Sequence, residues 1–268
     1  MTIEIGILGA DGRMGVALTK ALTHYKSARL SVALTHPSSE TLGQDIGTVS
    51  GLSETGVILS DNMETGLEQC DVLIDFSAPQ AAIDAAQLMP QRRCQHMVSG
   101  TTGFSPDQNQ LFDETAKTIS LLRSGNFSPG LNALSALVEL ASEKLSAGWD
   151  IEILEMHHRH KVDAPSGTAL LLGEAAAKGR GQDLKDAAVL SREGQTGARD
   201  EKDIGFATLR GGGVIGQHEV RLASELEMIT LSHDAFDRSV FARGAIDAAL
   251  WLAKQPKGLY NMKHVLGF

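Results

Sequence analysis

Cysteine is scarce in this chain, with two residues in 268, Cys70 and Cys94. Two cysteines make no disulfide framework, so we expect a reducing compartment, the cytoplasm, and a fold held by its hydrophobic core. Basic residues are also in the minority: 24 lysines and arginines face 33 aspartates and glutamates, which leaves a formal net charge of -9. An acidic protein is a poor general binder of nucleic acid, because neutralising phosphates takes broad basic patches.

Long apolar runs are missing as well. No stretch approaches the roughly 18 apolar residues of a membrane span. The start, MTIEIGILGADGRMG, lacks the basic segment and unbroken apolar core of a signal peptide. The composition, 42% hydrophobic and 21% charged, is that of a globular protein long enough for one large domain or two smaller ones. We therefore expect neither a membrane nor a nucleic-acid partner.

Short apolar runs and helical patterns alternate in the first half of the chain. Runs typical of buried strands occupy 2–8, 29–34, 57–60, 71–76, 96–99 and 118–124. Helical patterns occupy 13–26, 79–89 and 106–117. Such alternation predicts an α/β fold with a doubly wound parallel sheet.

The pattern changes after residue 125. A long helix is expected at 131–147, a strand at 149–158, a helix after the PSGT segment, and an all-β region at 204–234. An amphipathic helix at 238–254 closes the chain and is expected to pack back on the first domain. The sequence therefore predicts a second, α+β domain, built on an open mixed sheet and inserted into the first.

A glycine loop lies between the first predicted strand and the first predicted helix. It consists of Gly9, Ala10, Asp11, Gly12, Arg13, Met14 and Gly15. In this position, glycines allow a tight turn, close approach of the backbone to a pyrophosphate, and close packing of helix on strand. The loop predicts a dinucleotide site, and the alternative is a glycine-rich turn that binds nothing.

The segment after the second predicted strand bears on which dinucleotide is bound. An acidic residue there binds the ribose hydroxyls of NADH, whereas basic or hydroxyl groups tolerate the 2′-phosphate of NADPH. Here Thr35, His36 and Ser38 precede the first carboxylate, Glu40. We expect NADPH to be preferred and NADH also used, unless the segment is only a loop and a nearby carboxylate swings in.

Two further segments follow predicted strands, GTTGF at 100–104 and NFSPG at 126–130. The carboxyl ends of parallel strands form the edge at which open α/β sheets bind ligands. Each segment alone is an ordinary turn. Together with the glycine loop they favour a nicotinamide pocket.

The densest positive charge lies in EMHHRHKVDAPSGTA, residues 155–169. One interpretation is a zinc site, since His158 and His160 would share one face of a strand, but no matching ligands accompany them and two basic neighbours would repel a cation. Another is a solvated basic run. A third joins the histidines and Lys161 to the helix start at PSGT, which would together bind a small substrate with several negative charges. A histidine there could also supply a proton at neutral pH.

The motifs GADGRMG, DFSAP, GTTGF, NFSPG, EMHHRHKVDAPSGTA, IGFATLRGG and FARGAIDAALWL occur in this order over nearly the whole chain. This set resembles the dihydrodipicolinate reductases of lysine biosynthesis. The resemblance implies NAD(P)H-dependent reduction of a cyclic dicarboxylate to tetrahydrodipicolinate and a homotetramer. It also implies a Rossmann-like dinucleotide-binding domain at 1–127 plus 237–268, and a substrate-binding and oligomerisation domain at 128–236.

The resemblance also assigns roles to residues. His157 matches the general acid, His158 a substrate-binding histidine, and Lys161 a lysine with a catalytic and a substrate-binding role. Gly167 and Thr168 match the pair that holds a substrate carboxylate. The nucleotide loop matches Gly9, Gly12, Arg13 and Met14, and the nicotinamide-side contacts match Gly100, Thr102, Asn126 and Phe127. Besides these matches, we expect the cofactor to contact Ala10, Asp11, Gly15, Thr35, His36, Phe76 and Thr101. No metal ligand is implied.

The chain departs from the family at one place, and the sequence also leaves two other functions open. Many members have an acidic residue followed by arginine where this chain has Thr35 and His36, which puts the use of NADH in doubt. The first other function is another nicotinamide-dependent amino-acid dehydrogenase of similar architecture. The second is a non-catalytic NAD(P)H-binding redox sensor, which would need the glycine loop but not the histidines.

Overall fold

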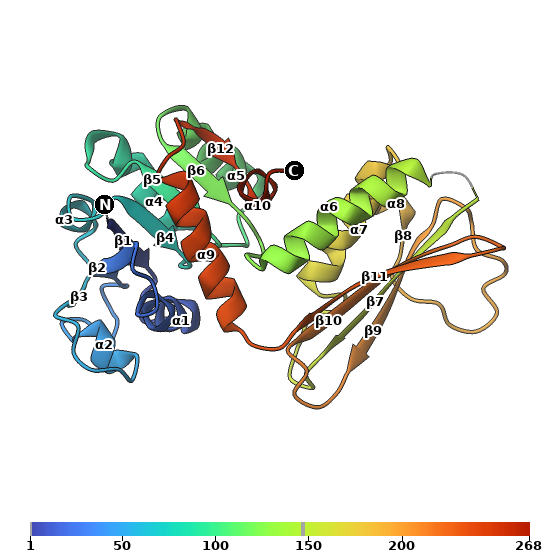
Figure 1. The fold of residues 1–268 in the computed structure, drawn as a ribbon, viewed down its shortest axis with the longest axis horizontal. Helices are drawn as coiled ribbons and strands as arrows, with labels where there is room; N and C mark the ends of the chain where they lie inside the picture. The colour runs from blue at the N-terminus through green and yellow to red at the C-terminus, as the bar shows by residue number, and fades with distance from the viewer. Residues whose placement is uncertain (1, 146–147) are drawn as a thin grey trace. The chain divides into compact units, whose positions relative to one another are not determined.

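The computed structural model describes residues 2–145 and 148–268 and divides the chain into two units (Figure 1). Unit 1 comprises Met1–Phe127 and Ser239–Phe268, and unit 2 comprises Ser128–Arg238. The chain thus leaves the first unit after Phe127 and returns at Ser239, two residues beyond the expected return at 237.

Unit 1 is built on a seven-stranded sheet in the order β12-β6-β5-β4-β1-β2-β3. All neighbouring strands run parallel. The strands are β1 (Ile3–Leu8), β2 (Ala28–Leu34), β3 (Leu59–Ser60), β4 (Val72–Asp75), β5 (His96–Ser99), β6 (Ser120–Arg123) and β12 (Gly258–Tyr260). The predicted doubly wound parallel sheet is confirmed, and β12 is a strand that the sequence did not predict.

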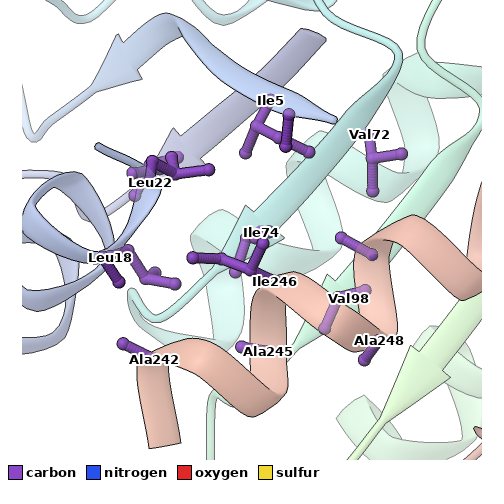
Figure 2. Packing of buried hydrophobic residues seen from close by; sticks show 14 of the residues in the cluster. Ile5, Leu18, Leu22, Val72, Ile74, Val98, Ala242, Ala245, Ile246 and Ala248 are labelled. Carbon is purple, nitrogen blue, oxygen red and sulfur yellow. The ribbon is translucent and has the colours of Figure 1, made fainter. Parts of the chain in front are cut away.

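Helices cover both faces of this sheet. They are α1 (Arg13–Leu22), α2 (Ile46–Val49), α3 (Met63–Leu67), α4 (Pro79–Leu88), α5 (Pro106–Glu114), α9 (Ser239–Leu252) and α10 (Met262–Leu266). Successive strand residues point to opposite faces. Ile74 accordingly packs with α1 and α9, while Leu73 packs with α4 and α5. Figure 2 shows Leu18 of α1 and Ile246 of α9 beside Ile74. The prediction that the last long helix packs on the first domain is therefore confirmed.

Unit 2 has a five-stranded mixed sheet in the order β11-β10-β7-β9-β8. Its strands are β7 (Asp150–His157), β8 (Ala188–Val189), β9 (Ile204–Arg210), β10 (Gly216–Ala223) and β11 (Met228–Ala235). β7 runs parallel to β9 and antiparallel to β10. The helices are α6 (Pro129–Lys144), α7 (Gly167–Gly179) and α8 (Leu184–Ala187).

One face of this mixed sheet is covered and the other is open. α6 and α7 lie side by side on the covered face (Figure 1), with Ile151, Ile153 and Val220 buried beneath them. On the open face, Leu209 of β9 and Met228 of β11 remain exposed. The predicted second domain with an open mixed sheet is confirmed. Among the described residues, no helix combines the length and apolar character that crossing a bilayer requires.

Several predicted boundaries differ from the observed ones. α1 ends at Leu22 rather than at 26, because the next residues form a tight turn in which the His24 and Tyr25 amides bond to Ala21 and Leu22. The predicted end of the helix at 147 lies outside the described residues. The strand predicted over 149–158 ends at His157, which leaves His158 outside the strand.

Candidate active site

The glycine loop has the geometry that a pyrophosphate needs. Gly9 has φ +80, and a Cβ there would lie 2.6 Å from the Phe76 carbonyl oxygen. A Cβ on Gly15 would overlap the Ala10 carbonyl group, so only glycine lets α1 start this close to the loop. Gly12 caps α1 without any side-chain hydrogen bond, which leaves the amides of the first turn open to an anion. These residues fit a dinucleotide.

Asp11 brings a carboxylate to the loop after β2. Its Oδ2 accepts hydrogen bonds from the hydroxyls of Ser39 (2.5 Å) and Thr41 (3.1 Å). Burial would raise the pKa of Asp11, but these hydroxyls and that of nearby Thr35 lower it overall. Sequence reasoning placed Asp11 in the glycine loop but missed this carboxylate beside the second strand, because the two segments are far apart in the chain.

Thr35 and His36 differ in what surrounds them. Thr35 is buried, and within the described part of the chain its hydroxyl makes no hydrogen bond of normal geometry. His36 is exposed, with Nδ1 2.7 Å from the Ser38 hydroxyl. The Thr35 hydroxyl is near enough to Asp11 to lower the pKa of that carboxyl, and since it makes no hydrogen bond of normal geometry it can also donate to a ligand at the end of β2.

Phe76, Gly100 and Thr101 meet at the ends of β4 and β5. A Cβ on Gly100 would overlap the Phe76 ring, and the Thr101 hydroxyl accepts a 3.0 Å hydrogen bond from the Ser77 amide. The Phe76 ring lies edge-on to Phe127, with centroids 5.5 Å apart. The structure thus brings three of the predicted cofactor segments into contact.

Asp75 underlies this contact and was missed by sequence reasoning. Its carboxylate is fully buried and accepts from the Ser77 hydroxyl (2.5 Å) and the Ser99 hydroxyl (2.6 Å). Burial raises the pKa of Asp75 despite these hydrogen bonds. The only sequence feature that could have indicated Asp75 is its place as an acidic residue at the end of a predicted strand.

A cavity of about 530 Å³ opens beside these segments. Thr101 and Thr102 line it together with Arg123 and Ser124 at the end of β6. The Ser124 hydroxyl donates to the Asn126 carbonyl oxygen at 2.6 Å and so shapes the turn before Phe127. Thr102 and Asn126 are therefore at the same edge of the sheet as the other predicted cofactor residues.

In unit 2, the covered face of β7 carries two polar residues beyond its apolar ones. Ile151 and Ile153 are followed on the same face by Glu155 and His157, which are 1% and 8% exposed. His157 Nδ1 lies 2.6 Å from Glu155 Oε2. The predicted proton donor is thus a nearly buried imidazole held by a carboxylate.

The other two histidines of the run lie outside the strand. β7 ends at His157, and the chain then turns, with the Lys161 amide donating to the His158 carbonyl oxygen at 3.1 Å. The expectation that His158 and His160 share a strand face is therefore wrong. Their rings are 6.2 Å apart, and His158 Nε2 faces the guanidinium of Arg238 at 3.3 Å. Desolvation and the charge of Arg238 lower the pKa of His158.

Lys161 and the start of α7 lie in the segment that follows. Lys161 Nζ is 2.8 Å from both carboxylate oxygens of Asp163. Ser166 caps α7, its hydroxyl accepting the Ala169 amide at 3.1 Å. Gly167 is exposed, and a Cβ there would meet open space. The Gly167 amide lies close enough to the Asp163 carboxylate to lower the pKa of that group, so a carboxylate already lies at the first turn of α7.

His218 is a neighbour that sequence reasoning missed. It comes from β10, its ring centroid lies 5.0 Å from that of His157, and its Nε2 is 3.2 Å from the Ser166 hydroxyl. Burial, with the nearby His157, lowers the pKa of His218 to about 3, so it is neutral at physiological pH. A lone histidine in a distant strand gave no signal.

The ligand sets needed for a metal are not found in this region. Across residues 2–145 and 148–268, no three His, Cys, Asp or Glu side chains are grouped so that they could hold a metal ion. Around His157 and His158 the nearby side chains include the cations Arg210 and Arg238.

Comparisons with known proteins agree with the motifs. Residues 3–127 match the family model for the dihydrodipicolinate reductase N-terminus, and residues 130–266 match the model for its C-terminus. The 4-hydroxy-tetrahydrodipicolinate reductase of Allorhizobium ampelinum is 50% identical over 99% of this chain and 98% of its own. That of Sinorhizobium medicae is 51% identical over 99% and 97%.

One solved structure points to the same family, and another shares only the fold. A dipicolinate-bound dihydrodipicolinate reductase from Paenisporosarcina sp. TG-14 superposes with a TM-score of 0.78 at 26% identity, over 97% of this chain and 98% of that one. A DAP dehydrogenase from C. glutamicum, at 12% identity over 99% and 96% and a TM-score of 0.54, shares only the fold. The chain belongs to the dihydrodipicolinate reductase family.

Proposed function

We infer that the protein is a 4-hydroxy-tetrahydrodipicolinate reductase. It reduces a dihydrodipicolinate-type cyclic dicarboxylate to tetrahydrodipicolinate with a nicotinamide cofactor, in the diaminopimelate route to lysine. The arrangement in unit 2 carries this proposal, since a nearly buried imidazole, an ammonium and the first turn of a helix come from one short segment. Relatives that share half of its residues over their full length bear this name.

Each residue of the site has a role in this reaction. The Gly167 and Thr168 amides and Lys161 would bind the two carboxylates, with His158 as a further hydrogen-bonding partner. The cofactor, when bound, supplies a hydride. Lys161 would stabilise the negative charge that then develops in the ring, and His157 would protonate the resulting carbon.

A coupled assay with the product of dihydrodipicolinate synthase tests the reaction. The reductase should oxidise NADPH or NADH in proportion to the substrate supplied. Cofactor binding without turnover would instead favour a redox sensor. Turnover with an amino acid but not with the cyclic substrate would favour another amino-acid dehydrogenase.

We propose that NADPH is the preferred cofactor and that NADH is also used. The hydroxyls near the end of β2 and His36 can donate to a 2′-phosphate, whereas Asp11 can accept from ribose hydroxyls. The wild-type kcat/KM should be higher with NADPH. Thr35→Glu should shift the preference toward NADH, because its carboxylate would repel the 2′-phosphate.

Initial rates at varied cofactor concentration measure this ratio. Thr23→Glu is the matched control, since it adds the same charge at the exposed far end of α1 and should leave the ratio unchanged. A wild-type enzyme that clearly prefers NADH would refute the proposed preference.

Turnover is expected to be independent of metal. His157 is bonded to Glu155, and Arg238 faces His158, so a cation would meet an engaged ligand and a repelling charge. Dialysis against a chelator should leave kcat intact. Loss of activity that zinc alone restores would overturn the roles given to both histidines.

We also propose that the protein is a cytoplasmic homotetramer, assembled through unit 2. The scarcity of cysteine is compatible with a reducing compartment. The exposed apolar residues on the open face of the mixed sheet, such as Leu209 and Met228, support association there.

A further inference from the structure

Glu155 is a buried carboxylate to which the reaction described above gives no role. The Glu155 side chain is 1% exposed, and its two carboxylate oxygens contact three groups. Arg210 donates to both oxygens at 2.8 and 2.9 Å, the Ser166 amide donates to Oε1 at 3.0 Å, and His157 Nδ1 lies 2.6 Å from Oε2. Such a carboxylate is fully satisfied, so its partners are held in fixed positions.

The contact with His157 determines which ring nitrogen can react. An ionised carboxylate only accepts hydrogen bonds, so the nitrogen that faces it, Nδ1, must carry a proton. The proton that is exchanged with a substrate is then the one on Nε2. That nitrogen faces Gly216, where a Cβ would lie only 3.1 Å away, so the absent side chain leaves room beside it.

Arg210 keeps this carboxylate ionised. Burial alone would raise the pKa of Glu155, but the hydrogen bonds from Arg210, His157 and Ser166 lower it overall. In return, Glu155 raises the pKa of Arg210. The pair is therefore charged at neutral pH, and Arg210 offsets part of the field that Glu155 exerts on His157.

The Glu155 carboxylate also contacts the start of α7. The Ser166 amide that it accepts belongs to the residue that caps α7, directly before Gly167. Arg210 also donates to the Asp163 carbonyl oxygen at 2.6 Å. The imidazole and the first amides of α7 thus share one support, although they come from different elements.

The other titratable and charged groups near His157 are few. β10 contributes His218, which is neutral because burial lowers its pKa to about 3. The segment after β7 contributes His158 and Lys161. The positive charge of Lys161 lowers the pKa of both His218 and His158. Among residues 2–145 and 148–268, Glu155 is the negative group in contact with the His157 ring.

We propose that Glu155, held by Arg210, is a positioning residue that presents the proton of His157 to the substrate on Nε2 and ties the imidazole to the start of α7. This rests on the proposed function. In the reaction, the Nε2 proton goes to a ring carbon and Glu155 remains ionised throughout.

The pH dependence of kcat separates positioning from support of the fold. A general acid must be protonated, so kcat falls as pH rises and the imidazolium loses its proton. Glu155→Gln removes the negative partner of the imidazolium. The fall of kcat at high pH, the basic limb of the pH profile, should therefore move to lower pH, and kcat itself should fall about 10- to 100-fold. Arg210→Gln leaves Glu155 unopposed, so the limb should move to higher pH.

Glu152→Gln is the matched control. Glu152 lies on the same strand and pairs with Arg192 and Arg199, away from His157. The Glu152→Gln variant should have a kcat and a basic limb of the pH profile close to those of the wild type. If Glu155→Gln and Arg210→Gln lower kcat with no shift, or with shifts in the same direction, the pair only supports the fold and the proposal is wrong.

A second measurement needs no turnover. In protein with ¹⁵N-labelled histidine, the neutral His157 ring should carry its proton on Nδ1, and Arg210→Gln should keep that tautomer. A proton mainly on Nε2 in the neutral wild-type ring would overturn the proposal, even if Glu155→Gln fails to fold. Absence of reductase turnover with the expected tautomer would instead refute the proposed function alone.

Discussion

Replacing His157 with glutamine is expected to lower kcat by roughly 10²- to 10⁴-fold, the usual contribution of a positioned acid. Glutamine can still hydrogen-bond to Glu155, so the nearly buried position should remain filled. What is lost is the proton that reaches the substrate carbon. Cofactor affinity should change little, because the glycine loop belongs to unit 1.

Steady-state kinetics with NADPH, together with a fluorescence titration of the cofactor, measure both quantities. His160→Gln is the control, since His160 is an exposed histidine of the same run and should behave as wild type. A near-normal kcat in His157→Gln would place the acid elsewhere, with His158 as the next candidate.

Replacing Lys161 with alanine should lower kcat by roughly 10²- to 10³-fold, because the ammonium stabilises charge that develops in the ring. Lys161 is now paired with Asp163, so a substrate carboxylate must share or displace that partner. The variant should also bind dicarboxylates weakly while binding NADPH normally.

A planar diacid isolates the binding role. Pyridine-2,6-dicarboxylate should inhibit competitively against the substrate, since it carries two carboxylates on a ring that does not readily accept hydride. Pyridine-2-carboxylate should bind far more weakly, because Lys161 or the amides at Gly167 and Thr168 lose their charged partner. Salt should weaken binding modestly, as the Lys161 side chain is only 20% exposed.

Titration of both acids, with cofactor bound, compares wild type, Lys161→Ala and Lys178→Ala. Lys178 lies on α7, where it pairs with Glu139 and is 71% exposed, so its variant should match wild type. Equal affinity for the two acids, or an unaffected Lys161→Ala, would mean that the basic run is a solvated surface.

Local patterns were enough to predict most of the fold. The apolar runs at 71–76 and 96–99 predicted the strands β4 and β5, and the helical pattern at 106–117 predicted α5. The short strand β12 was missed, because three residues carry no periodicity. Its pairing with β6 makes it a strand.

The histidine run shows where a local rule fails. The rule that successive side chains of a strand point to opposite faces predicted one shared face for His158 and His160. That rule applies only where the strand is paired in a sheet. Pairing stops at His157, opposite Arg210 of β9. A partner more than fifty residues away therefore decided the orientation of these side chains.

The sequence by itself determined the glycine loop, the order of strands and helices, and the helix start at Ser166, because each depends on sterics and hydrogen bonds among neighbouring residues. Only the tertiary structure decided that Asp11 meets Ser39, that Arg210 holds Glu155, and that His218 lies beside His157. Those contacts depend on strand order and register. Both are fixed by burial of whole sheet faces, which no short segment encodes.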